Sequence, residues 1–120
     1  MHTTCEADVR RLPGAAVIAL SGDIDGAATD ALTTAYESAV AGAGPATVVL
    51  DFSHVGYINS TGIALIVSVL AKARAQQRAV AAAGLSEHYR EIFDITRLSD
   101  FIELIPDLDH ALGRFSEAAG

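Results

Sequence analysis

The feature that most constrains the fold is a change of hydrophobic period in the middle of the chain. Residues 46–52 form a short apolar run rich in β-branched side chains, which is typical of a central parallel strand covered by helices. From Ser60 to Gln76 the apolar residues recur at three- and four-residue spacing, which predicts an amphipathic helix. A buried strand that leads through a short polar loop, residues 53–59, into such a helix indicates an α/β fold.

The rest of the chain supplies further strands and helices in alternation. Pro13-Gly14 is a turn signal that joins the first two strands into a hairpin. The other predicted elements are strands at 4–11, 15–21, 78–83 and 101–105 and helices at 27–41, 86–95 and 107–115. The order β-β-α-β-α-β-α-β-α predicts a single α/β domain over residues 1–120, with an N-terminal hairpin, a mostly parallel mixed sheet, right-handed crossovers and about four helices.

Composition and charge exclude several classes of protein. The net charge is −7 with eight Lys and Arg among 120 residues, so a nucleic-acid or anionic membrane surface is not expected. The N-terminus lacks a basic region followed by an apolar run, so no signal peptide is predicted. The densest apolar stretch, residues 63–71, is about half of the ~20 residues that a membrane span requires. A cytoplasmic protein is therefore expected.

The sequence offers no assembled catalytic or metal-binding set. Cys5 is the single cysteine, and we interpret it as a small, partly buried apolar residue. Asp23-x-Asp25-Gly26 resembles the start of a calcium loop, but the twelfth position holds Thr34 rather than glutamate. Four histidines lie on different predicted elements without metal-ligand spacing: His2, His54, His88 and His110. We therefore expect no enzyme activity, no catalytic residue, no metal and no cofactor.

The helix predicted from Ser60 has two unlike faces when its residues are placed at 100° intervals. One face is apolar and should pack on the sheet, with Gly62 at its margin allowing close approach to the strands; its residues are Ile63, Ile66, Val69, Leu70 and Ala73. The opposite face is small and smooth; its residues are Thr61, Ala64, Leu65, Ser68, Ala71, Lys72 and Ala75. This face indicates a docking surface for a partner, and the alternative is a helix that only tolerates alanine on its outside.

Two hydroxyl residues stand at the predicted start of this helix. Ser60 suits an N-cap, whereas Thr61 extrapolates to the outer face beside Leu65 and Ser68. A phosphate on Thr61 would add about −1.5 to −2 charges at the helix N-terminus. The helix dipole would favour that charge by about 0.3–1 kcal/mol, whereas a partner packed on the smooth face would have to desolvate it. That asymmetry is what a phosphorylation switch requires.

Several segments together resemble the signature of STAS domains, in particular bacterial anti-sigma factor antagonists. The match covers about residues 15–112, and the similar segments are Leu-Ser-Gly-Asp-Ile-Asp at 20–25, Val-Val-Leu-Asp-Phe-Ser at 48–53, Ile-Asn-Ser-Thr-Gly at 58–62 with Leu65, and Phe-Asp-Ile-Thr-Arg-Leu at 93–98 with Phe101. The resemblance implies an unphosphorylated form that binds an anti-sigma factor, itself a serine kinase, and so frees the sigma factor. It implies phosphorylation at Thr61, with Ser60 as the alternative, and a serine/threonine phosphatase that resets the switch.

The remaining partner-site residues follow from the resemblance and from the smooth face: Asp23, Asp25, Asn59, Ser60, Gly62, Ala64, Leu65, Ser68 and Lys72. Asn59 departs from the family, which usually carries aspartate there, and Asp23 and Asp25 are as well suited to closing a turn. A second hypothesis is a STAS subunit that docks constitutively in a lipid-transport complex or sensory assembly. Nucleotide or small-molecule binding in the loops has no supporting pattern, and a weak homodimer stays open.

Overall fold

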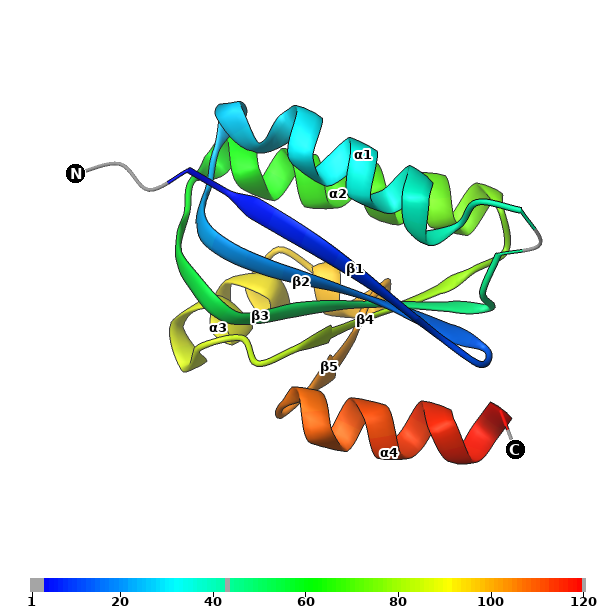
Figure 1. Cartoon of the computed structure of the whole chain (residues 1–120). Helices are drawn as coiled ribbons and strands as arrows, with labels where there is room; N and C mark the ends of the chain where they lie inside the picture. The colour runs from blue at the N-terminus through cyan, green and yellow to red at the C-terminus, as the bar shows by residue number, and fades with distance from the viewer. Residues whose placement is uncertain (1–3, 43, 120) are drawn as a thin grey trace.

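The fold follows the predicted order of elements, with helices on both faces of one sheet (Figure 1). The computed structural model describes residues 4–42 and 44–119. Its strands are β1 (Glu6–Leu12), β2 (Ala15–Ile24), β3 (Thr47–Ile58), β4 (Ala79–Ala83) and β5 (Glu103–Ile105). Its helices are α1 (Thr29–Ala39), α2 (Ser60–Ala75), α3 (Glu87–Ile95) and α4 (Leu108–Ala119), with short 3₁₀ turns η1 (Gly26–Ala28) and η2 (Leu98–Asp100). The predicted fold class is confirmed.

The sheet has the strand order β1-β2-β3-β4-β5. The hairpin β1–β2 is antiparallel, and every later pair is parallel. Because parallel neighbours need a crossover, a helix separates each of these strands along the chain. The carboxyl ends of β2 and β3 therefore lie together, at the edge of the sheet where α2 begins.

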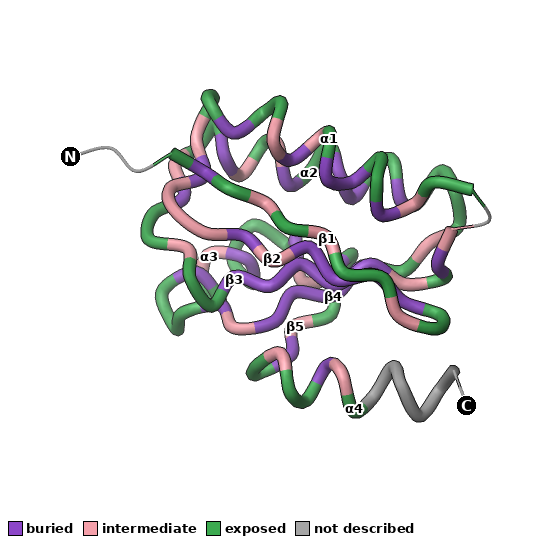
Figure 2. The backbone as a smooth tube through the Cα atoms, in the orientation of Figure 1, coloured by how far each residue is buried: buried purple, intermediate pink, exposed green. Residues whose placement is uncertain are grey.

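Two cores form on the two faces of the sheet, because successive strand residues point to opposite sides. α1 and α2 cover the face that carries Ile18, Val48 and Leu50, and α4 covers the face that carries Val17 and Val49. The inner strands are buried along most of their length, whereas β1 and the outer sides of the helices are exposed (Figure 2). β4 contributes mostly alanines to these cores.

Strand β3 is longer than predicted. The expected strand ends at Phe52 and a polar loop follows, but β3 continues to Ile58. β4 stops at Ala83, which is paired with Asp51, so the later residues of β3 have only β2 as a neighbour. Their exposed side chains are polar for that reason, and the same irregular pairing carries β2 past the predicted Ser21 to Ile24.

Smaller corrections concern the ends of other elements. The helix predicted from Ala27 begins as the 3₁₀ turn η1, and α1 starts at Thr29. The strand predicted over 101–105 is only Glu103–Ile105, because residues 98–100 form η2 and Phe101 ends that turn. Both differences reflect short turns that hydrophobic spacing does not distinguish from a helix or strand end.

Candidate functional site

The start of α2 is fixed by the side chain of Asn59, not by Ser60. Asn59 has an extended backbone, and its Oδ1 accepts a hydrogen bond from the backbone N–H of Gly62 at 2.8 Å. Its carbonyl oxygen accepts the first helical bond from the N–H of Ile63 at 2.9 Å. The prediction of Ser60 as the cap is therefore wrong: Asn59 is the N-cap, and Ser60 is the first helical residue. Asn and Asp cap helices about equally well, so the amide preserves this function without the charge.

Gly62 seats the first turn of α2 directly on the end of β2, as the sequence predicted. A Cβ atom on Gly62 would lie 2.0 Å from the carbonyl oxygen of Ile24, a distance that no side chain can occupy. The same carbonyl accepts a hydrogen bond from the N–H of Asn59 at 3.2 Å. Two backbone segments thus touch at this point, and only glycine allows them to.

The end of β3, which leads into this turn, is held from α3. The hydroxyl group of Tyr89 accepts a hydrogen bond from the backbone N–H of Ile58 at 2.8 Å, and Tyr89 is only 8 % exposed. One turn further along α3, Phe93 meets Phe52 of β3 edge-to-face, with the ring centroids 6.2 Å apart. Three elements, β2, β3 and α3, therefore fix where α2 begins.

Ser60 and Thr61 are both exposed on this fixed turn. The Thr61 methyl carbon lies 3.6 Å from the position that a Cβ atom on Gly26 would take, so Thr61 borders the turn between β2 and α1. That turn also carries Asp25, the residue before Gly26. The structure thus brings together two segments that are more than thirty residues apart in the sequence.

The two aspartates have structural contacts of their own. Asp25 caps η1, because its Oδ1 accepts a hydrogen bond from the N–H of Ala27 at 3.0 Å. Asp23 Oδ1 lies 3.0 Å from the position of a Cβ atom on Gly56, next to the end of β3. The turn-closing function considered for Asp25 from the sequence is confirmed.

The outer face of α2 runs away from the hydroxyls along the helix. Ala64, Ser68 and Lys72 are exposed, whereas Leu65 is half-buried and packs against the core. The rise of a helix places Lys72 about 16 Å from Thr61, so the predicted partner residues form a strip rather than a cluster. Val67, which is 43 % exposed, also lies on the outside of α2 and was missed because it falls at the margin of the predicted face.

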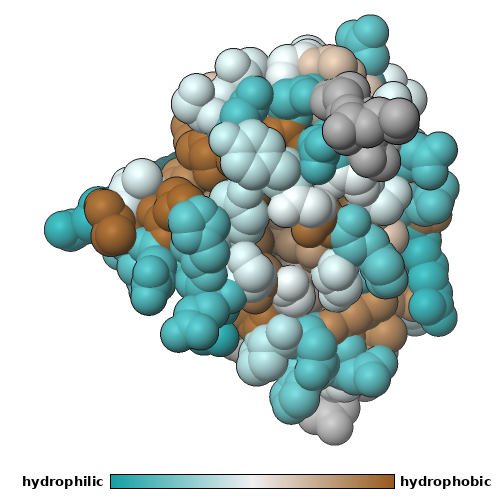
Figure 3. Space-filling model, turned by 90° about the vertical axis from the view of Figure 1, so that its left-hand side faces the viewer, coloured by the Kyte–Doolittle hydropathy of each residue, from teal (hydrophilic) through white to brown (hydrophobic). Residues whose placement is uncertain are grey.

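The end of the molecule where α1 and α2 begin has a surface of mixed polarity. Figure 3 looks onto this end and shows teal and white residues with brown patches between them.

Cysteine and the residue types that bind metals are the other candidates for chemistry in the part of the chain that the structure describes. Cys5 is buried, and burial raises the pKa of its thiol, with the nearby charges of Asp25 and Glu6 acting in the same direction. Within residues 4–42 and 44–119 no group of three or more His, Cys, Asp or Glu side chains could hold a metal ion, and His2 lies outside the described residues. In the same part of the chain, every helix is too short or too polar to cross a membrane.

A mixed five-stranded sheet with an exposed Ser-Thr pair at a tightly seated helix start defines a small α/β domain built around one helix N-terminus. Residues 7–106 match the family model described as "Mlab, STAS domain". The chain belongs to the STAS domain family.

Individual relatives are similar over different lengths. The anti-sigma-B factor antagonist of Listeria monocytogenes is 36 % identical over 55 residues, which are 46 % of this chain and 48 % of that protein. The chain thus spans about half the length of the curated relatives it matches. The crystal structure of an anti-sigma factor antagonist from Mycobacterium paratuberculosis has a TM-score of 0.77 at 26 % identity, covering 93 % of this chain and 94 % of that one. The Bacillus cell fate determinant SpoIIAA in its phosphorylated form shares the fold, with a TM-score of 0.71 at 17 % identity over 90 % of this chain and 97 % of that one.

Proposed function

We propose that this chain is an anti-sigma factor antagonist whose binding is controlled by phosphorylation of Thr61, with Ser60 as the alternative acceptor. The unmodified form binds an anti-sigma factor that is also a serine kinase and releases the sigma factor, and a serine/threonine phosphatase reverses the modification. The observation that carries this proposal is an exposed Thr61 next to Gly62 on a helix start fixed by backbone contacts. The chain acts as a binding protein in this scheme, without catalysis or a cofactor.

The fold itself can accept a phosphate at this position. Thr61 is in the first turn of α2, where the helix dipole favours negative charge by about 0.3–1 kcal/mol. The cap residue is the neutral Asn59, so the new charge meets no carboxylate in the cap itself. The effect of the phosphate on the stability of the free protein is therefore expected to be small.

A bound partner is in a different position. The face that continues from Thr61 is small and neutral through Ala64 and Ser68. A partner packed there would have to take the phosphate, with its charge of about −1.5 to −2, out of water. Phosphorylation therefore costs the complex much more than it costs the free protein.

The tight seating of α2 indicates how the switch works. Gly62 touches the carbonyl of Ile24, and the cap and the Tyr89 hydrogen bond hold both sides of the turn. A phosphate on exposed Thr61 does not need to break any of these contacts. We therefore expect the phosphate to control partner binding through its charge and its contacts at the docking surface, while the helix keeps its position.

The similarities to known proteins support the same conclusion. The curated relative and the Mycobacterium structure are both named as anti-sigma factor antagonists. The SpoIIAA structure shows that one protein of this fold exists in a phosphorylated form.

The test is phosphate incorporation by the anti-sigma factor serine kinase encoded nearest to this protein's gene. We expect labelling of the wild type, loss of labelling in Thr61→Ala and retained labelling in Ser60→Ala. Ser68→Ala is the matched control, because Ser68 is an exposed hydroxyl residue about two turns further along the same helix. Phosphopeptide mass spectrometry identifies the modified residue.

Two outcomes would redirect the proposal. Unchanged labelling of Thr61→Ala with loss in Ser60→Ala would move the site to Ser60. No labelling at all, together with co-purification of a transporter or ATPase subunit, would support the alternative, in which the same small-residue face docks constitutively.

A further inference from the structure

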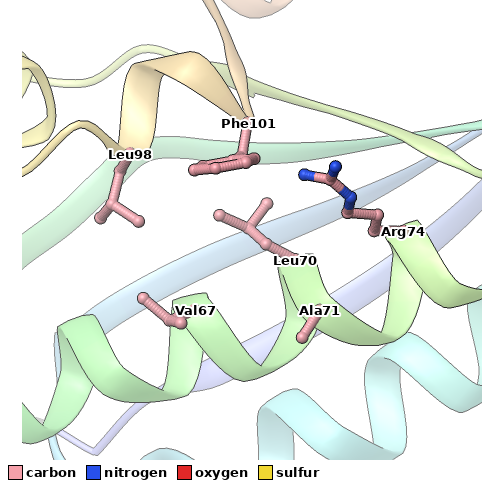
Figure 4. Close-up of a pocket in the computed structure, with 6 residues that line it drawn as sticks. All are labelled: Val67, Leu70, Ala71, Arg74, Leu98 and Phe101. Carbon is pink, nitrogen blue, oxygen red and sulfur yellow. The ribbon is translucent and has the colours of Figure 1, made fainter.

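An apolar groove separates α2 from the η2 turn, on the side of α2 away from α1. Its lining is Val67, Leu70, Ala71 and Arg74 from α2 with Leu98 and Phe101 from the η2 turn, and its volume is about 240 Å³. Figure 4 shows Leu98 and Phe101 reaching down from η2 over the α2 side chains. Leu70 and Leu98 are buried, one on each side of the groove, whereas Val67 and Phe101 are 43 % and 56 % exposed.

The rim of the groove carries a positive charge. The guanidinium carbon of Arg74 lies 5.2 Å from the centre of the Phe101 ring, a cation–π contact that holds both side chains at the mouth (Figure 4). Arg74 is the charged residue of the groove lining, and Asp100, next to Phe101, is paired with Arg97 at 3.1 Å. The groove therefore suits an apolar group that is accompanied by a carboxylate.

The size of the groove favours a side chain over a free metabolite. Clefts for drug-sized ligands span about 300–1,000 Å³, and an apolar cavity of about 150 Å³ holds one benzene molecule. At about 240 Å³ the groove fits one or two apolar side chains. That volume suits the insertion of a side chain from a protein.

The same chain presents a matching projection. Ile95, the last residue of α3, is 80 % exposed. Among the large apolar residues of residues 4–42 and 44–113, this is the highest exposed fraction. The neighbouring Asp94 is also exposed and supplies a carboxylate. Ile95 stands three residues before Leu98, so the projection and the groove lie on adjoining parts of one surface.

We propose that two copies of this chain associate about a two-fold axis, with Ile95 of each copy in the groove of the other. Such an interface is self-complementary, because each copy provides one projection and one groove. Asp94 of one copy then faces Arg74 of the other, and this charge pair forms twice. Few residues take part, so the dimer is weak, with a dissociation constant of about 10 μM to 1 mM.

This contact is separate from the proposed phosphorylation site. The groove begins at Val67, about two turns along α2 from Thr61, and the dimer does not require either hydroxyl residue. Val67 and Ala71 lie on the outside of α2, so the dimer would cover part of the surface available to other partners. Dimerisation therefore competes with the binding of other partners to the C-terminal half of α2.

Sedimentation equilibrium of the full chain from about 10 μM to about 1 mM tests this proposal. We expect reversible dimerisation of the wild type and at least a tenfold weaker dimer for Ile95→Asp, because a charge cannot enter the apolar groove. Arg74→Glu should weaken the dimer to a similar extent, and adding Asp94→Arg to it should restore association. Circular dichroism and the melting temperature confirm that each variant is folded.

Arg10→Glu is the matched control, because it makes the same charge reversal on β1, at the opposite edge of the sheet from β5. We expect it to dimerise like the wild type. A wild type that stays monomeric over the whole range would overturn the proposal. Dimerisation that Ile95→Asp leaves unchanged, or that Arg10→Glu weakens as much as Arg74→Glu does, would also contradict it.

Discussion

Helices α2 and α4 lie on opposite faces of the same sheet, and their N-termini are built in opposite ways. α2 has the neutral cap Asn59 and a glycine in direct contact with the β2 backbone. α4 begins at an exposed turn, where the carboxylate of Asp107 accepts a hydrogen bond from the N–H of His110 at 2.9 Å. The His110 ring nitrogen Nδ1 lies 2.7 Å from the same oxygen.

The difference shows what each helix start is built for. At α4 the negative charge of Asp107 already interacts with the positive end of the helix dipole, and His110 contacts the Asp107 carboxylate. At α2 backbone contact with Ile24 sets the position, and the cap adds no charge. Of these two helix starts, that of α2 therefore has no carboxylate in its cap, whereas that of α4 has one.

The largest expected effect comes from replacing the glycine that seats α2. Gly62→Ala should lower the free energy of unfolding by about 3 kcal/mol or more, because the added methyl group would overlap the carbonyl of Ile24. Gly113→Ala is the matched control in α4, where a Cβ atom would meet nothing within 4 Å. That variant should gain up to about 1 kcal/mol from helix propensity. Urea denaturation measures both, and equal effects would refute the contrast between the two helices.

The next effect concerns the hydrogen bond that holds the strand before α2. Tyr89→Phe removes the hydroxyl that accepts from the N–H of Ile58 and leaves that buried N–H without its partner. We expect a loss of about 1–3 kcal/mol in unfolding free energy, with faster amide exchange at Ile58. An unchanged exchange rate at Ile58 would show that the contact does not fix the site.

Changes at the cap of α2 should have a smaller effect on stability. Asn59→Ala should cost about 1 kcal/mol, whereas Asn59→Asp should stay within a few tenths, because either side chain can accept from the Gly62 N–H. Thermal unfolding at low ionic strength compares the two variants. If Asn59→Asp destabilises as much as Asn59→Ala does, the cap interpretation of this residue is wrong.

The smallest effect is a pH dependence confined to α4. The carboxylate of Asp107 raises the pKa of His110 above its usual 6.5, and hydrogen bonds from His110 lower the pKa of Asp107 below its usual 3.8. A raised histidine pKa contributes stability that is fully present below 6.5 and is lost as the pH rises through the folded value. His110→Gln should therefore lower the melting temperature slightly at about pH 6 and hardly at about pH 8. A difference that is the same at both pH values would contradict this interpretation.

Much of the fold could be predicted from periodicity and turn residues. The apolar run before Asp51 and the helix spacing after Ser60 were sufficient for the order of elements, and the close approach at Gly62 followed from its place on the helix wheel. The extension of β3 to Ile58 was not predictable in this way, because it depends on where β4 stops.

The site itself was only partly accessible from the sequence. The cap was assigned to Ser60 because several residues before the helix could fill that position, and only the backbone conformation distinguishes Asn59 from its neighbour. The groove depends on Val67 and Phe101, which are more than thirty residues apart and meet only in the folded chain. Local patterns cannot show such a meeting.

The most direct test of the account compares the affinities of the unmodified and the Thr61-phosphorylated protein for the anti-sigma factor kinase by titration calorimetry. Amide NMR spectra of the two free forms should differ only near residues 59–64 and in the adjoining turn around Gly26 if α2 stays seated on β2. The account predicts that phosphorylation weakens binding by about a hundredfold or more, because the complex would enclose an unpaired dianion. Equal affinities for the two forms, with phosphate confirmed on Thr61, would contradict it.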